Sequence, residues 1–242
     1  MKNLPRLILL IFLASSSVGA KSQIIISLLF GDALNTDEIE FGLIGGFNES
    51  FLLDIEESKG LTNFNLGFYF HINMFKNSYL STGVLVKSNV GAKGMPVYSV
   101  GDDEFDDVYS EGKLTKKISY FYVPIMWHQR LNNNRWYIEG GLQLGLRSKA
   151  YDYFDVDSEE EYGGQLSYKR DTRDEYTRFD GGLLGGIGYK FKKEIKSLAV
   201  GVNYYYGLKN VSTLPDQTLK NSSVYFYVKI PIGTHPKEKD KS

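Results

Sequence analysis

The twelve residues NFNLGFYFHINM, at positions 63–74, decide the fold of this chain. Every second residue from Phe64 to Met74 is apolar, and the residues between them are polar or small. Because successive side chains of a strand point to opposite faces, this pattern predicts a β-strand with one apolar and one polar face. At about 3.3 Å per residue the stretch would reach roughly 40 Å, enough to cross the hydrocarbon core of a bilayer when tilted.

The same alternation recurs along the chain and predicts further strands. The eight predicted strands are residues 38–48, 63–74, 79–90, 117–130, 135–150, 174–191, 197–208 and 222–233. Their connections alternate in length, and the long ones are residues 49–62, 91–116, 151–173 and 209–221. Long extracellular loops and short periplasmic turns are typical of outer-membrane barrels, so we expect these four loops on the outer side.

The choice between a membrane barrel and a soluble, lipocalin-like barrel depends on which face points outward. The apolar face carries roughly 40 side chains, more than the interior of eight strands can hold. Trp127 and Trp136 flank one short turn, as expected of an aromatic girdle at the periplasmic interface. The sequence therefore predicts an all-β fold, an eight-stranded antiparallel up-and-down transmembrane β-barrel.

The N-terminus has the three parts of a secretory signal. Lys2 and Arg6 are basic, residues 7–14 are apolar, and Val18-Gly19-Ala20 fits a cleavage site. Because so short an apolar run cannot span a bilayer, we predict a cleaved signal rather than a membrane anchor. The predicted organisation is a signal peptide at 1–20, a periplasmic segment or extra strand at 21–37, the barrel at 38–233 and a charged tail at 234–242.

The composition excludes several classes of protein. Removing Lys2 and Arg6 from the 28 basic residues leaves 26 against 29 acidic ones, a net charge of −3, which argues against a nucleic-acid-binding surface. The chain has no Cys, so it can form no disulfide framework. No other segment approaches 18 consecutive apolar residues, which excludes a helical membrane protein.

Five motifs in order resemble a known family. They are IISLLFGDALN at 25–35, GVLVKSNVGAKG at 83–94, YFYVPIMW at 120–127, FDGGLLGGIGYKF at 179–191 and SVYFYVKIPIG at 223–233. Because these motifs occur together in this order, the chain resembles the PorT-like outer-membrane β-barrel family. The resemblance implies an eight-stranded barrel in the bacterial outer membrane, and it implies partners because some members are tied to type IX secretion or gliding machinery. Most members have no assigned activity, so no residue role is carried over.

The polar face carries most of the candidate chemistry. Its ionisable residues are Glu40, His71, Lys87, His128, Glu139, Arg147, Arg178, Asp180, Lys190 and Lys229. We expect these groups to pair with one another across a narrow lumen, because unpaired charge in a confined site is costly. A conducting pore is the first alternative, although wide channels need about 16 strands.

Catalysis is the second alternative, and it would need His71 or His128 as a base. Both histidines lie four residues before a predicted short turn, near the periplasmic rim. The sequence contains no Gly-x-Ser-x-Gly, His-Glu-x-x-His or phosphate-loop motif, so no catalytic, cofactor-binding or metal-binding residue is assigned.

Two acidic clusters, at 102–107 and 152–161, lie in the predicted long loops. Each can be solvated loop, or can hold Ca²⁺ or Mg²⁺ that bridges to lipopolysaccharide phosphates. The expected function is a non-enzymatic structural or interaction role through the extracellular loops, with outer-membrane lipid as one partner and no nucleic acid. Transport of a small solute or lipid, and hydrolysis, are the alternatives.

Overall fold

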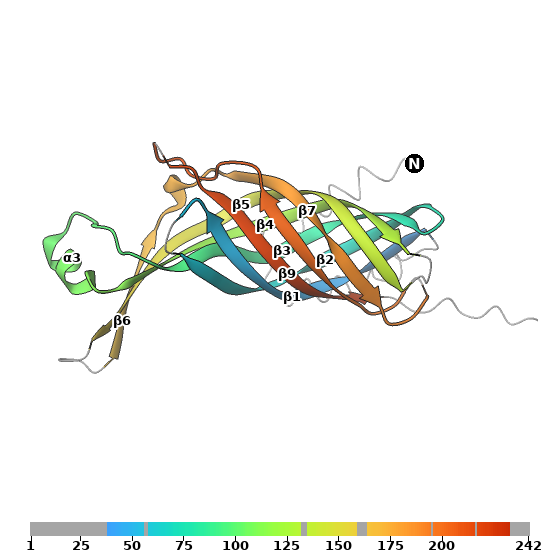
Figure 1. The fold of residues 1–242 in the computed structure, drawn as a ribbon, viewed down its shortest axis with the longest axis horizontal. Coiled ribbons are helices and arrows are strands. Elements are labelled where there is room, and N and C mark those ends of the chain that lie inside the picture. Colours follow the sequence, from blue (N-terminus) through green and yellow to red (C-terminus); the bar gives the residue numbers. More distant parts are fainter. Residues whose placement is uncertain are drawn as a thin grey trace, which may run out of the picture.

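A closed ring of antiparallel strands forms the body of the molecule (Figure 1). The computed structural model describes residues 38–55, 58–131, 135–158, 164–194, 196–215 and 217–232. The signal peptide predicted at 1–20, the segment at 21–37 and the tail at 234–242 lie outside these residues. Within them, no helix has the length and apolar character needed to cross a membrane.

Nine strands belong to the part of the chain that the structure describes. They are β1 (Ile39–Leu53), β2 (Lys59–Phe75), β3 (Ser78–Met95), β4 (Lys113–Arg130), β5 (Trp136–Ser158), β6 (Gly164–Asp171), β7 (Phe179–Lys190), β8 (Ala199–Gly207) and β9 (Lys220–Pro231). The helix α3 (Asp103–Tyr109) and the 3-10 turn η1 (Arg173–Glu175) lie between strands. The sheet order is β4-β3-β2-β1-β9-β8-β7-β5-β6, and a further β4–β5 pairing closes eight of these strands into the predicted barrel.

The register of the pairs fixes the shape of the ring. Paired residues can be followed once round the barrel from Ile39 through Ile72, Leu80, Trp127, Gly140, Gly185, Tyr204 and Val224 to Glu49. The path returns to β1 ten residues further on, because 49 minus 39 is 10. A stagger of this size goes with strands tilted by about 35–45° and an interior just wide enough for side chains.

The two faces of the barrel are as the alternation predicts. Outward side chains such as Phe226 and Leu144 are 56% and 52% exposed in the isolated chain, whereas the luminal Tyr122 is fully buried. Trp127 contacts Phe75, and Trp136 contacts Tyr189, at the end of the short turns. These four aromatic side chains therefore lie at the short-turn end, where the girdle was predicted, and the exposed apolar band beyond them is of the kind that lipid covers.

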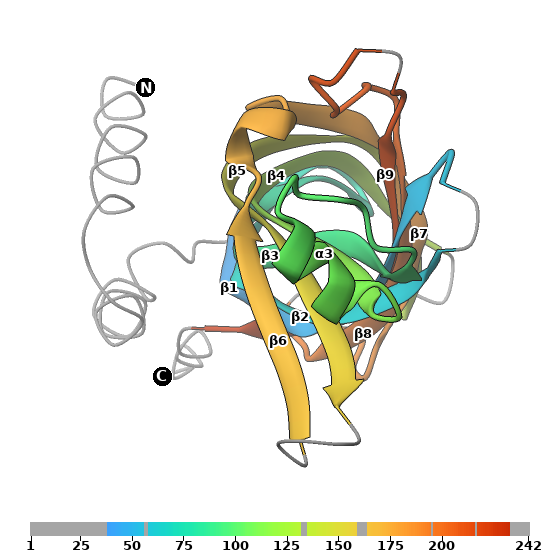
Figure 2. The same ribbon diagram turned by 90° about the vertical axis from the view of Figure 1, so that its left-hand side faces the viewer.

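The prediction of a loop at 151–173 is wrong, because most of this segment is strand. β5 continues to Ser158 and pairs with β6 from Tyr151↔Asp171 to Ser158↔Gly164, which makes a hairpin that projects beyond the barrel (Figure 2). The loops predicted at 49–62 and 91–116 are also shorter than predicted, since β1, β2, β3 and β4 all run past the predicted strand ends. In the hairpin the buried side of β5 carries Asp152 beside Phe154, so the apolar-polar alternation that marks the spanning strands is interrupted there.

The hairpin has a small aromatic core of its own. Phe154 is fully buried, and its ring lies 5.3–6.3 Å from the rings of four neighbours. Those neighbours are Tyr98, Phe105, Tyr109 and Tyr168. α3 supplies two of them, and Asp102 caps its N-terminus by accepting a hydrogen bond from the Phe105 amide at 3.1 Å. We call β5 beyond Tyr151, β6, α3 and residues 96–102 the outer extension.

We predict that Phe154→Ala loosens the outer extension and leaves the barrel intact. Truncating a buried Phe costs about 3–5 kcal/mol, which is more than a small unit of this size can lose and stay ordered. Limited proteolysis should cut the variant within residues 96–112 or 156–168. The difference in gel mobility between boiled and unboiled protein, which reports the folded barrel, should stay unchanged. Tyr153→Ala is the control, since Tyr153 is half-buried on the other face of the hairpin. Equal protease resistance of Phe154→Ala and the parent would contradict the assignment.

Candidate functional site

A chain of buried ionisable groups fills the lumen near the short-turn end. It begins at Glu40, whose carboxylate accepts hydrogen bonds from the Tyr69 hydroxyl at 2.7 Å and the Lys190 ammonium at 3.1 Å. His71 Nδ1 lies 3.6 Å from the same carboxylate. All four side chains are at most 3% exposed. Charges this far from water are tolerated because each has a partner.

Glu139 is the centre of the second half of the chain. Its Oε1 accepts from the Asn203 amide and the Tyr227 hydroxyl, each at 2.8 Å. Its Oε2 accepts from the Lys229 ammonium at 2.9 Å, and lies 3.2 Å from His128 Nδ1. Both carboxylate oxygens are therefore fully used by the protein.

Lys229 joins the two halves, because its Nζ also lies 3.4 Å from His71 Nε2. The sequence of contacts is Lys190, Glu40, His71, Lys229, Glu139 and His128. With both imidazoles neutral, two ammonium groups balance two carboxylates. The arrangement is a charge-balanced plug across the lumen, which we call the ion-pair plug.

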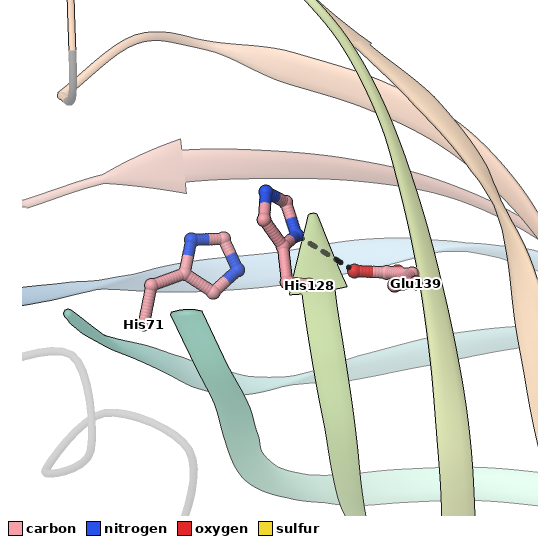
Figure 3. A group of neighbouring side chains, drawn as sticks. All are labelled: His71, His128 and Glu139. Atoms are coloured by element: carbon pink, nitrogen blue, oxygen red, sulfur yellow. Dashed lines mark hydrogen bonds and ion pairs between the residues drawn. The ribbon is translucent and has the colours of Figure 1, made fainter. Parts of the chain in front are cut away.

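His71, His128 and Glu139 are also a candidate metal-binding set (Figure 3). Among the described residues, one ligand atom of each lies within 4.8 Å of the others, and all three side chains are buried. His128 Nε2 has no hydrogen-bond partner in the part of the chain that the structure describes. The Lys229 ammonium, however, already contacts both Glu139 and His71, so it supplies the positive charge that an ion would bring. The geometry favours the ion-pair plug over a metal centre.

Between the ion-pair plug and the long-loop end, the lumen is filled by tyrosines and aliphatic side chains. Tyr122 and Tyr205 are fully buried, and Asp180 accepts hydrogen bonds from the Tyr122 hydroxyl at 3.0 Å and from Asn221 at 2.8 Å. Between these two layers lies a partly open pocket of about 40 Å³, bordered by Asn203 among others. That volume holds a few water molecules and no larger solute.

The prediction that polar-face residues pair across the lumen is confirmed for most of them. Glu40, His71, His128, Glu139, Asp180, Lys190 and Lys229 all lie inside with partners. Arg147 is half-buried, and its Nε donates to the Thr177 carbonyl oxygen at 3.2 Å.

The prediction is wrong for Lys87 and Arg178. Lys87 points outward, with its Nζ 5.7 Å from the centre of the lipid-facing Phe64 ring. A register shift between Leu85 and Ser88 breaks the alternation at this point of β3. Arg178 is exposed just before β7 begins.

The uncharged members of the lumen network were not singled out by sequence reasoning. Tyr69, Tyr137, Tyr227 and Asn203 each lie on the polar face of a predicted strand, so the alternation places them inside. Their partners depend on the ten-residue stagger of the ring, which no local pattern contains. Only that stagger brings Tyr227 of β9 to Glu139 of β5.

The acidic clusters of the long loops also find internal partners. Asp152 is fully buried and accepts hydrogen bonds from Lys116 at 2.6 Å and Tyr98 at 2.9 Å. Burial and the Asp152 carboxylate raise the pKa of the Tyr98 hydroxyl, which keeps its proton for this bond. Hydrogen bonds from Ser99 and from the Val100 amide lower the pKa of Asp106 below its ordinary value. These carboxylates hold the outer extension together.

A closed antiparallel barrel with an apolar exterior and a filled polar interior defines a membrane-spanning β-barrel protein. The family described as outer membrane protein beta-barrel domain matches residues 30–213, about three quarters of the chain. The chain belongs to this family, and its place is therefore the bacterial outer membrane. No curated protein matches the chain.

Solved structures of small outer-membrane proteins are similar to the chain. Ail, the attachment invasion locus protein of Yersinia pestis, solved with the heparin analogue sucrose octasulfate, shows 12% identity and a TM-score of 0.41, covering 81% of this chain and 99% of its own. Neisserial surface protein A shows 11% identity and a TM-score of 0.42, covering 78% and 96%. OprG of Pseudomonas aeruginosa shows 13% identity and a TM-score of 0.31, covering 80% and 94%.

Proposed function

We propose that this protein is a non-enzymatic outer-membrane barrel that presents the outer extension to a protein partner. The observation that carries the proposal is the outer extension itself. It has its own buried core around Phe154, which gives it a defined shape beyond the lipid. A loop that only joins two strands needs no such core.

The exposed face of the outer extension has the character of a contact surface. Val108 of α3 is 47% exposed and Leu166 of β6 is 36% exposed. Three acidic residues of α3 are also exposed, namely Asp103, Glu104 and Asp107. Exposed apolar and acidic side chains on one extension suit a partner that offers apolar and basic side chains.

The ordered motifs that resemble the PorT-like family support a partner from a secretion or motility apparatus. The state of the histidines supports a role without catalysis. His71 and His128 are buried, and the Glu139 carboxylate beside His128 also accepts from Asn203, Tyr227 and Lys229, so it is held in a structural network. A substrate would have no route to either imidazole through the filled upper lumen.

Site-specific photo-crosslinking in intact cells tests the proposal. We expect a crosslinking residue placed at Val108 or Leu166 to give one discrete protein adduct, identified by mass spectrometry. The same residue at Ile138, which is 48% exposed in the apolar band, should give none because it faces lipid. Adding Phe154→Ala should abolish the adducts from Val108 and Leu166. The proposal fails if those two positions behave like Ile138.

Conductance separates this function from the transport alternative. We predict that the purified barrel shows no single-channel steps in a planar bilayer, because the ion-pair plug and the tyrosine layer close the lumen. A porin in the same bilayer provides the positive control. Reproducible steps above the leak current would favour passage of a small solute instead.

A further inference from the structure

Two groups of basic residues in the described chain differ in whether they have acidic partners. The first group lies in the lumen or at the outer extension and has them, as in Lys190–Glu40, Lys229–Glu139, Lys116–Asp152 and Arg170–Glu175. The second group lies on the outside of the barrel at the long-loop end, and has no ion-pair partner within the described residues. This group consists of Lys87, Lys117, Lys149, Lys209 and Lys220, and we call it the lysine collar.

The side chains of the lysine collar point away from the lumen. Lys117, Lys149 and Lys220 each precede a fully buried luminal residue on β4, β5 and β9, so they face outward by alternation. The Nζ atoms of Lys87 and Lys209 lie 5.7 and 6.0 Å from the centres of two outward aromatic rings, Phe64 and Phe179. Four strands, β3, β4, β5 and β9, and the residues just after β8 therefore each present one ammonium group on the outside of the barrel.

The lysine collar lies next to the apolar band, on its long-loop side, and this fixes its position along the barrel axis. Leu208 is 53% exposed and directly precedes Lys209, and Phe179, under the Lys209 ammonium, is 59% exposed. Because large apolar side chains mark the hydrocarbon, ammonium groups just above them lie at the depth of the lipid headgroups. The opposite end of the barrel carries the aromatic girdle instead.

A like-charge pair at the same end strengthens the argument. Lys59 of β2 lies directly opposite Lys93 of β3, and neither has an ion-pair partner among the described residues. Like charges directly opposite each other in a sheet are destabilising. An anion from outside the protein would remove this cost.

We infer that the lysine collar binds the phosphate groups of anionic lipids in the outer leaflet. The collar is continuous with the lipid-facing band, so a bound lipid keeps its chains on that band while its phosphates reach the ammonium groups. Each lysine near an anionic surface contributes favourably, and the contribution falls with ionic strength. This surface is separate from the outer extension, and its role does not depend on the proposed protein partner.

Native mass spectrometry of the detergent-solubilised full chain tests the inference, with diphosphoryl lipid A as the probe. Replacing all five collar lysines by Gln should weaken binding at least tenfold. The matched control replaces five other lysines, Lys76, Lys169, Lys192, Lys193 and Lys196, and should stay within twofold of the parent. If the variant with all five substitutions fails to fold, the pairs Lys117/Lys149 and Lys209/Lys220 are replaced separately. Each double variant should bind the lipid two- to threefold more weakly than the parent.

Two further arms identify the ligand chemistry. Lipid A stripped of its phosphates should bind the parent at least tenfold more weakly than the diphosphoryl form. Inorganic phosphate at the same phosphate concentration should displace little of the lipid. Equal binding by collar and control variants, equal binding of the two lipids, or full displacement by inorganic phosphate would each overturn the inference.

Discussion

Lys229→Met is expected to lower the free energy of unfolding by about 3–5 kcal/mol. Met matches the length of Lys and fills the same space, so the change removes charge and little volume. Glu139 then keeps a buried carboxylate without its ammonium partner, and His71 Nε2 loses its contact with the Lys229 ammonium. Urea unfolding in lipid vesicles measures the effect, with Trp127 and Trp136 as fluorescent reporters near the plug end.

Two further variants separate charge from packing in this prediction. Lys193→Met changes an exposed lysine at the same end of the barrel and should unfold within about 0.5 kcal/mol of the parent. Lys229→Met combined with Glu139→Gln should be more stable than Lys229→Met alone, because it removes the unpaired charge. An unchanged unfolding midpoint for Lys229→Met would show that the ion-pair plug does not stabilise the barrel.

Gly186→Val is expected to prevent normal barrel assembly or to lower the free energy of unfolding by more than about 3 kcal/mol. A Cβ atom at Gly186 of β7 would overlap the carbonyl oxygen of Val202 on β8. That neighbour is backbone, so it cannot rotate away as a side chain would. The yield of folded, heat-modifiable protein after refolding into vesicles is the measurement.

Gly140→Val is the matched control for this prediction. Gly140 is exposed on the lipid-facing side of β5, and an added Cβ would have its nearest neighbour, Leu184 O, at 4.0 Å. The variant should refold as well as the parent, since Val adds apolar surface to a face that lipid covers. Equal yields from Gly186→Val and Gly140→Val would contradict the close strand approach at Gly186.

The spanning part of the fold was predictable because lipid imposes one rule on every strand. Phe121, Val123, Ile125 and Trp127 face outward as the alternation requires, while Tyr122 and His128 face inward. The rule failed at Lys87 because a bulge in β3 adds a residue to the repeat, and nothing in the sequence marks that position.

The composition of the lumen network was predictable, but its pairing was not. Glu40 and Lys190 are 150 residues apart, and they meet because β1 and β7 are placed by the stagger of the whole ring. The outer extension was missed for a different reason. Asp152 and Phe154 share the buried side of β5, so a charged and an aromatic residue interrupt the apolar-polar pattern there.

β5 has 23 residues and belongs to two parts of the molecule, since it runs from Trp136 at the girdle to the tip of the hairpin without a break. A partner that pulls on the tip therefore loads one continuous strand. The load spreads over the many hydrogen bonds that β5 makes with β4 and β7, which must give way together rather than one by one. We expect the hairpin to transmit force to the membrane-spanning barrel with little extension of the chain.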